Sequence, residues 1–275
     1  MMNTKCLYKD VCSKRNTKNC DTACVRYLQI NRLIELSNLP ELYKTPIRIH
    51  SESAKNDINS FIFLSKIKKD IVNFVNNGGN LYICSKYCGN AKTSWATKLM
   101  LKYFDKMWQN SYDCTRGLYV HVPTLLSDLK NFNNPPEYIS RIKEADLVIW
   151  DDLATKINRL SEYEHEQLLI FIDNRVANKK SNIYTSNMTS EIELSSNVGS
   201  RLTSRIYNSS EIVELVSSDY RPSIVSNVIS NTLNNVAEKT TQTTQENIIE
   251  EVKTEEHIKK KRGRPPKNKP IEEIK

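Results

Sequence analysis

Apolar residues between positions 57 and 75 recur at steps of three and four, which is the spacing of one face of an α-helix. They are Ile58, Phe61, Ile62, Leu64, Ile67, Ile71, Phe74 and Val75. The turn-forming run at 76–80, which includes Gly78 and Gly79, ends this predicted helix. The apolar run at 81–84 then predicts a buried strand, and residues 93–104 predict a second helix. Strand, loop and helix in this order form a βα unit.

Four further apolar segments predict strands later in the chain. They lie at 118–122, 147–150, 183–185 and 212–216, and helical patterns separate most of them, notably at 162–177. Strands that alternate with helices form mostly parallel sheets covered on both faces. The sequence therefore predicts an α/β fold with a mostly parallel, five-stranded sheet.

The last 54 residues have a different composition from the rest of the chain. Residues 231–245 are rich in Thr, Asn and Gln, and no pattern there would bury one face, so 222–275 are predicted to be a disordered linker and tail. No apolar stretch approaches the ~20 residues of a membrane span, and the first residues lack the apolar run of a secretory signal. We therefore expect a reducing, intracellular location.

The net charge of +8 is concentrated toward the two ends, because residues 51–221 are nearly balanced. Basic ends on a balanced body indicate a polyanionic partner that the appendages contact.

The loop after the first predicted strand is similar to the Walker A pattern, G-x-x-x-x-G-K-[ST], at its Lys92-Thr93 end. In that pattern the Lys reaches the β- and γ-phosphates, the Thr hydroxyl binds Mg²⁺, and the backbone amides, here of Gly89 to Lys92, cradle the phosphates. Lys86 and Ala91 stand where the pattern has Gly. If the Ala91 position needs a positive φ, its Cβ costs about 1–2 kcal/mol. The alternative is a loop that contains Lys-Thr by chance.

An apolar strand that ends in two acids, Asp151 and Asp152, has the form of a Walker B motif. Asp151 would hold Mg²⁺ through water, and Asp152 would act as general base toward the attacking water. The alternative is that the two acids cap the segment that follows. Asn187 follows a later strand and could orient that water, although its Thr-Ser-Asn context is also typical of turns. Arg201 and Arg205, four apart on a predicted helix, could serve a γ-phosphate of a neighbouring subunit or pair with surface acids.

Four cysteines fall within the first 24 residues, at positions Cys6, Cys12, Cys20 and Cys24. Four thiolates suit tetrahedral Zn²⁺, whose binding would supply the folding free energy that so short a segment lacks. Their spacing matches neither common ferredoxin pattern, so a structural zinc site is the preferred hypothesis and free thiols are the alternative.

A basic run near the end of the chain has an Arg-Gly-Arg-Pro centre that resembles an AT-hook. Its residues are Lys259, Lys260, Lys261, Arg262, Gly263, Arg264, Pro265, Pro266 and Lys267. The two arginines would lie along a narrow A·T-rich minor groove, Gly263 would avoid its wall, and the lysines would contact phosphates. A generic basic tail is the alternative.

Taken in order, the motifs around Lys92, Asp151, Asn187, Arg205 and Arg221 resemble the DnaC/DnaI-type replicative helicase loaders, which are AAA+ ATPases related to DnaA and IstB. The resemblance covers about residues 58–221. It implies that Asn187 is sensor 1, that Arg205 is an arginine finger, and that Arg221 is near a second sensor. The ATP-binding set that it implies is Gly89, Asn90, Ala91, Lys92, Thr93, Ser94 and Arg221.

The resemblance also implies partners and an organisation into three parts. Residues 1–50 would be the helicase-binding zinc module, 51–221 the AAA+ ATPase domain, and 222–275 the linker and tail. The expected cofactors are ATP, Mg²⁺ and Zn²⁺. The expected partners are a replicative hexameric helicase, single-stranded DNA, A·T-rich duplex DNA and further copies of the chain, in the cytoplasm of a bacterium or a phage-infected cell.

Three functions remain open from the sequence. The first is an ATP-dependent helicase loader, and the second is an IstB-like transposition ATPase, which would less readily explain the cysteines. The third is a DNA-binding adaptor that retains a nucleotide fold without hydrolysis, as Ala91 would permit.

Overall fold

A computed structural model describes residues 6, 17, 20, 21, 23–45, 55–110, 115–130, 136–154 and 160–217. Cys12, Arg221 and the whole predicted tail, including its basic run, lie outside these residues.

The described core is a five-stranded sheet. Its strands are β1 (Asn80–Cys84), β2 (Gly117–His121), β3 (Leu147–Asp151), β4 (Ser181–Ser186) and β5 (Glu211–Glu214). They lie in the order β2-β3-β4-β1-β5, and every neighbouring pair is parallel. All five predicted strands are present, and the predicted parallel sheet is confirmed.

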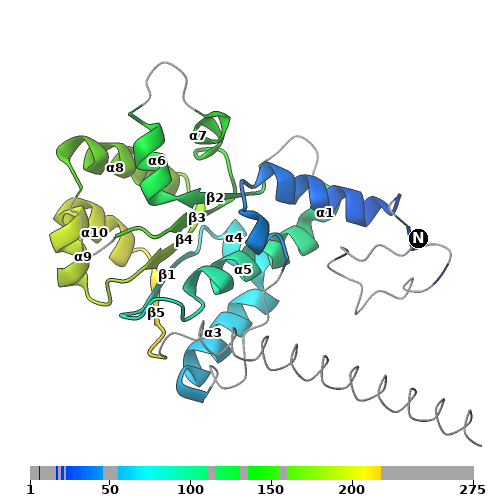
Figure 1. Cartoon of the computed structure of the whole chain (residues 1–275), viewed down its shortest axis with the longest axis horizontal. Helices are drawn as coiled ribbons and strands as arrows, with labels where there is room; N and C mark the ends of the chain where they lie inside the picture. Colours follow the sequence, from blue (N-terminus) through cyan, green and yellow to red (C-terminus); the bar gives the residue numbers. More distant parts are fainter. Residues whose placement is uncertain are drawn as a thin grey trace, which may run out of the picture. The chain divides into compact units, whose positions relative to one another are not determined.

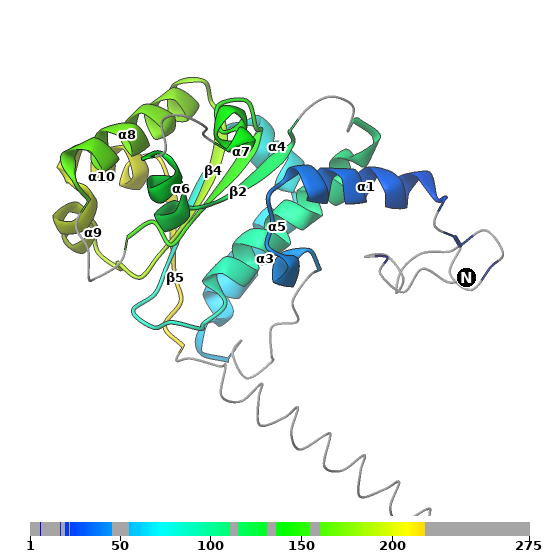
Figure 2. The same cartoon turned by 45° about the horizontal axis from the view of Figure 1, so that its top comes forward.

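Helices cover both faces of the sheet (Figures 1 and 2). On one face lie α1 (Val25–Leu36), α3 (Ile58–Lys69), α4 (Ile71–Asn76) and α5 (Lys92–Met107), together with the short turns η1 (Glu41–Tyr43) and η2 (Trp108–Asn110). On the other lie α6 (Val122–Asp128), α7 (Glu137–Arg141), α8 (Glu162–Ala177), α9 (Glu191–Val198) and α10 (Ser200–Tyr207). Side chains alternate along β3: Leu147 and Ile149 pack against the helices of the first face, which include α5, whereas Val148 and Trp150 pack against those of the second, which include α8.

The single helix predicted over 57–75 is wrong, because α3 ends at Lys69 and α4 begins at Ile71. Between them Asp70 leaves helical geometry, with φ −111° and ψ 33°. Its carboxylate accepts a hydrogen bond of 2.7 Å from the Asn73 side chain, which offers the backbone a local alternative to the helix. The apolar pattern continues across the break, so spacing alone did not reveal it.

The described part of the N-terminal segment packs onto the sheet layer. Ile30, Leu33 and Ile34 of α1, with Leu39, are buried in the same core as α5. Arg26 forms an ion pair with Asp105 of α5. The division into parts at residues 50 and 221 stays a prediction.

One buried arginine, Arg175 of α8, links the segment that precedes β3 with the first residues of β4. It is fully buried, and its Nη1 donates hydrogen bonds of 2.7 Å to the carbonyls of Ile142 and Ala145. Its remaining donors reach the Ser181 carbonyl at 2.5 Å and the Asn182 Oδ1 at 2.7 Å. Burial lowers the pKa of Arg175 to about 10, so it stays a cation at neutral pH.

We expect Arg175→Met to destabilise the fold strongly, because it removes the side-chain donor from three buried carbonyls, while the Asn182 Oδ1 keeps its hydrogen bond from the Trp150 indole. Each unsatisfied acceptor costs roughly 1–3 kcal/mol, so a loss of at least about 3 kcal/mol is expected. Thermal unfolding measures it, and Lys143→Met, at an exposed position, is the matched control. Equal midpoints for the two variants would contradict the structural role of Arg175.

Candidate nucleotide-binding site

The loop that follows β1 is anchored by two polar side chains, Ser85 and Asn90. The Ser85 hydroxyl accepts hydrogen bonds from the Tyr87 backbone amide, at 3.1 Å, and from the Asn90 side chain. Asn90 is buried, and its amide nitrogen lies 3.3 Å and 3.4 Å from the carbonyls of Leu215 and Ser217, just after β5. The side chain of Asn90 therefore fixes the loop to the neighbouring strand, while its backbone amide remains a candidate phosphate ligand.

Two residues of the loop adopt left-handed backbone conformations, Gly89 with φ 77° and Ala91 with φ 72°. Ala91 is the N-cap of α5, and its carbonyl accepts the first helical hydrogen bond, from the Trp95 amide at 2.9 Å. An alanine in this region costs about 1–2 kcal/mol. The position that the Walker pattern gives to Gly thus needs a positive φ here, and the chain carries a Cβ there.

Lys92 turns its ammonium group back into this loop. Its Nζ donates to the Tyr87 carbonyl at 2.8 Å and lies 3.3 Å from the Asn90 Oδ1. Burial lowers the pKa of Lys92, while nearby groups, chiefly Cys88 and Asp152, oppose that shift. The ammonium is therefore partly desolvated among neutral oxygen atoms, which the charged oxygens of a phosphate would replace favourably.

The Asp151 carboxylate receives three hydroxyl donors at the end of β3. Its Oδ1 accepts hydrogen bonds of 2.7 Å from Thr93 and from Thr185, and its Oδ2 accepts one of 2.6 Å from Tyr119. The structure thus brings together Thr93 and Asp151, the two predicted Mg²⁺ ligands. Hydroxyl and carboxylate oxygens are the hard donors that Mg²⁺ prefers, so this pair fits the ion.

Asp152 directly follows and also has a left-handed backbone, with φ 56°. Its backbone amide donates to the Thr185 hydroxyl at 3.1 Å. Burial raises the pKa of Asp152, and the Asp151 charge raises it further, against smaller opposite effects of His121 and Lys92. A carboxylate with raised proton affinity is suited to act as a general base.

Asn187 lies just beyond the end of β4, beside the loop. Its Nδ2 is 3.9 Å from the Cys88 Sγ. Its Oδ1 is buried and accepts no hydrogen bond from any residue that the structure describes. A buried acceptor without a donor suits a water molecule or a ligand group at this place.

Arg205 pairs within its own chain, because its Nε lies 2.7 Å from the Asp173 Oδ1 of α8. The observed contact is thus the surface pairing that the sequence left open as the alternative. Arg201 is exposed one turn earlier on α10. Arg221 lies outside the described residues.

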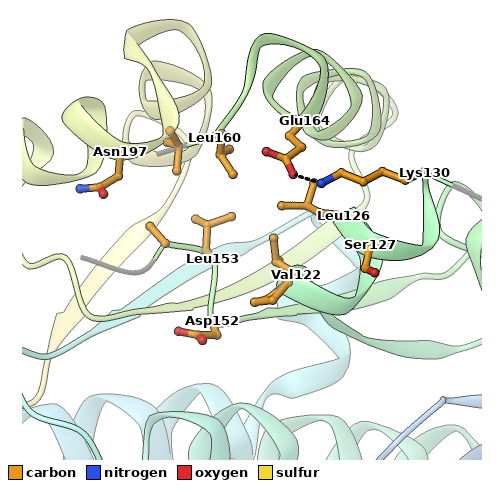
Figure 3. Close-up of a pocket in the computed structure, with 12 residues that line it drawn as sticks. Val122, Leu126, Ser127, Lys130, Asp152, Leu153, Leu160, Glu164 and Asn197 are labelled. Carbon is orange, nitrogen blue, oxygen red and sulfur yellow. Dashed lines mark ion pairs between the residues drawn. The ribbon is translucent and has the colours of Figure 1, made fainter. Parts of the chain in front are cut away.

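A pocket of about 200 Å³ opens beside Asp152, between α6, α8 and α9 (Figure 3). Its walls are mainly apolar, with Leu126, Leu153 and Leu160 among them, and the ion pair between Lys130 and Glu164, 3.0 Å apart, lies at its far end. No residue from 85 to 94 lines it. Among the predicted site residues that the structure describes, only Asp152 lines this pocket.

The zinc hypothesis rests on residues that are only partly described. Cys6, Cys20 and Cys24 are free thiols, and within the described ranges no three His, Cys, Asp or Glu side chains converge as metal ligands. Cys12, the fourth expected ligand, lies outside them. None of the helices in the described part is long and apolar enough to cross a membrane.

Sequence signals missed Tyr119 and Thr185, the two further donors to Asp151. Both lie inside segments that the sequence predicts to be buried strands, and tyrosine and threonine are common in strands. Only the register of the strands identifies them as neighbours of Asp151.

Comparison with known proteins supports the fold. No protein-family model matches the chain, and no curated protein matches its sequence. A solved DnaC helicase loader superposes with a TM-score of 0.50 at 19% identity, covering 64% of this chain and 99% of that one. A solved DnaI superposes with a TM-score of 0.52 at 18% identity, covering 69% of this chain and 100% of the other. These likenesses confirm the α/β fold with a parallel sheet that the sequence predicts.

We expect Ala91→Gly to stabilise the protein. Glycine removes the left-handed strain of about 1–2 kcal/mol, and this gain exceeds the roughly 0.5–1 kcal/mol of extra backbone entropy that glycine loses on folding. The thermal midpoint should rise by a few degrees. Ala96→Gly, in the interior of α5, is the control and should lower it. A lower midpoint for Ala91→Gly would mean that the strain is absent.

Proposed function

We propose that the chain is an ATP-dependent loader that places a replicative DNA helicase on single-stranded DNA. The observation that carries the nucleotide part is the hydrogen bond between the Thr93 hydroxyl and the Asp151 carboxylate, directly beside the loop that holds Lys92. The loading part is supported by the order of the motifs and by a fold shared with a DnaC helicase loader.

In this proposal ATP is bound by the backbone amides of Gly89 to Lys92 and by the Lys92 ammonium group. Thr93 and Asp151 hold Mg²⁺, which supplies positive charge to the phosphates when bound. Asp152 accepts a proton from the attacking water, whose oxygen bonds to the γ-phosphorus as the bond to the β-γ bridging oxygen breaks. The Oδ1 of Asn187, to which no described residue donates, accepts a hydrogen bond from the second O–H of that water.

The finer parts of the proposal concern the partners. Copies of the chain assemble with ATP between them, and Arg205 exchanges Asp173 for the γ-phosphate of a neighbour. Cys6, Cys12, Cys20 and Cys24 bind zinc in a helicase-binding module. The basic run that contains Arg262 and Arg264 binds A·T-rich duplex DNA.

The strained Ala91 specifically favours a second candidate, a DNA-binding adaptor that binds nucleotide without hydrolysing it. Absence of turnover together with tight ATP binding would support that candidate.

ATP hydrolysis by the purified protein, with and without single-stranded DNA, tests the proposed function. We expect DNA-stimulated turnover that Lys92→Ala lowers by at least about 100-fold, because the substitution removes the cation that stabilises the transferring phosphoryl group. Lys143→Ala, at an exposed site, should retain the native rate. Turnover that survives Lys92→Ala would exclude this site, and co-purification with the host's replicative helicase separates a loader from a transposition ATPase.

We expect Asp152→Asn to lower ATP turnover by roughly 10²- to 10⁴-fold through loss of the general base. The same variant should unfold at an equal or higher temperature at neutral pH. The folded pKa of Asp152 is raised, so the ionised group opposes folding at any pH above that pKa, and asparagine removes this cost. A large loss of thermal stability would contradict this assignment.

The same raised pKa predicts the pH dependence of the native enzyme. Turnover should fall as the pH is lowered through the pKa of Asp152, and the fall should begin at a higher pH than for an ordinary carboxyl group. A profile of kcat against pH measures it.

A further inference from the structure

The edge of the sheet beside β2 is covered by the segment that follows α1. The backbone amide of Tyr119 donates to the Ser37 carbonyl at 2.7 Å, and the Asn38 side chain donates to the Tyr119 carbonyl at 3.2 Å. β2 is an edge strand, so these contacts satisfy backbone groups that a neighbouring strand would otherwise pair. The backbone of Tyr119 is thus held from the N-terminal side of the chain.

The turn that makes these contacts is itself well fixed. Asn38 has a left-handed backbone, with φ 56°, which aims its amide group at the strand. The buried Ser37 hydroxyl donates to the Ile34 carbonyl at 2.6 Å, and the Leu36 carbonyl accepts a 2.7 Å hydrogen bond from Arg141. Tyr43 of η1 then packs its ring 6.3 Å from that of Tyr119.

The side chain of Tyr119 reaches in the opposite direction, to the metal-binding carboxylate. Tyr119 pairs with Ile149 across the sheet, and His121 pairs with Asp151, so Tyr119 and Asp151 are diagonal neighbours on the face that α5 covers. A tyrosine spans such a diagonal, and its hydroxyl lies 2.6 Å from the Asp151 Oδ2. The Tyr119 hydroxyl is the donor of this hydrogen bond, and the carboxylate oxygen accepts it.

We infer that Tyr119 is a positioning residue for Asp151, and that the segment from Ser37 to Tyr43 controls Mg²⁺ binding through it. The inference rests on the proposed function, because it takes Asp151 as a ligand of Mg²⁺. A partner that displaces the segment after α1 removes the backbone contacts of Tyr119 and so weakens its hold on the carboxylate. The N-terminal part of the chain thereby acts on the nucleotide site without contacting it.

Binding of a fluorescent ATP analogue, measured once with excess Mg²⁺ and once with excess EDTA, tests this inference. Tyr119→Phe removes only the hydroxyl group. Asn38→Gly removes the side-chain contact with the strand edge, leaves the Ser37 carbonyl contact in place and keeps the left-handed turn. Tyr103→Phe is the matched control, because its buried hydroxyl also contacts an aspartate, Asp146 at 3.2 Å, away from Asp151. Thermal unfolding of each variant establishes that it folds.

We expect Tyr119→Phe to weaken binding in Mg²⁺ by about tenfold, the lower range for loss of a group that orients a metal ligand, and to leave binding in EDTA unchanged. Asn38→Gly should also weaken binding in Mg²⁺, by a smaller factor. Tyr103→Phe should leave binding unchanged both in Mg²⁺ and in EDTA. The positioning role of Tyr119 would be overturned if Tyr119→Phe weakened nucleotide binding equally in Mg²⁺ and in EDTA, or weakened it in neither. Native affinity for Asn38→Gly would overturn control by the N-terminal segment. If the native protein bound no nucleotide at all, the proposed function itself would fail.

Discussion

The Asp151 carboxylate is the group on which the arrangement of the site depends. It is 7% exposed, and a buried carboxylate is costly unless hydrogen bonds stabilise its charge. Three hydroxyls do so, from Thr93 on α5, Thr185 on β4 and Tyr119 on β2. A helix and two strands on either side of β3 are therefore drawn to one point, which is also the point where a metal ion would neutralise the charge.

The residues expected to contact the nucleotide and Mg²⁺ were predictable from the sequence. The residues that hold Asp151 in place were not. Lys92-Thr93 follow the first apolar strand after a short loop, and Asp151 ends another apolar strand. The carboxyl ends of parallel strands meet at one edge of the sheet. Tyr119 and Thr185 lie within strands, where burial alone explains their presence. Only the register, which no sequence spacing encodes, places them on the same face as Asp151.

In the phosphate loop, too, the features set by the local motif were predictable, and the contacts made with residues far away in the sequence were not. The left-handed backbone of Ala91 could be suspected from the sequence, because the Walker pattern has Gly at that position. The anchor of the loop could not, because Asn90 reaches carbonyls 125 and 127 residues away. Asp57 holds the same stretch after β5, because its carboxylate accepts a hydrogen bond of 2.7 Å from the Val216 backbone amide. The strain at Ala91 thus persists because contacts on both sides of the loop fix its backbone.

The pairing of Arg205 with Asp173 is compatible with a role for Arg205 between subunits. Both side chains are partly exposed, at 53% and 33%, and such pairs contribute only about 0.2–1 kcal/mol. A bidentate contact with a phosphate is stronger, so a γ-phosphate on a neighbouring copy would displace Asp173 at little cost. The helix that carries Arg205 is fixed independently, because Gly199 has a φ of 84° and the Thr203 hydroxyl donates to the Gly199 carbonyl at 2.9 Å. Exchange of partner therefore requires only a side-chain movement, and α10 can keep its place on α8.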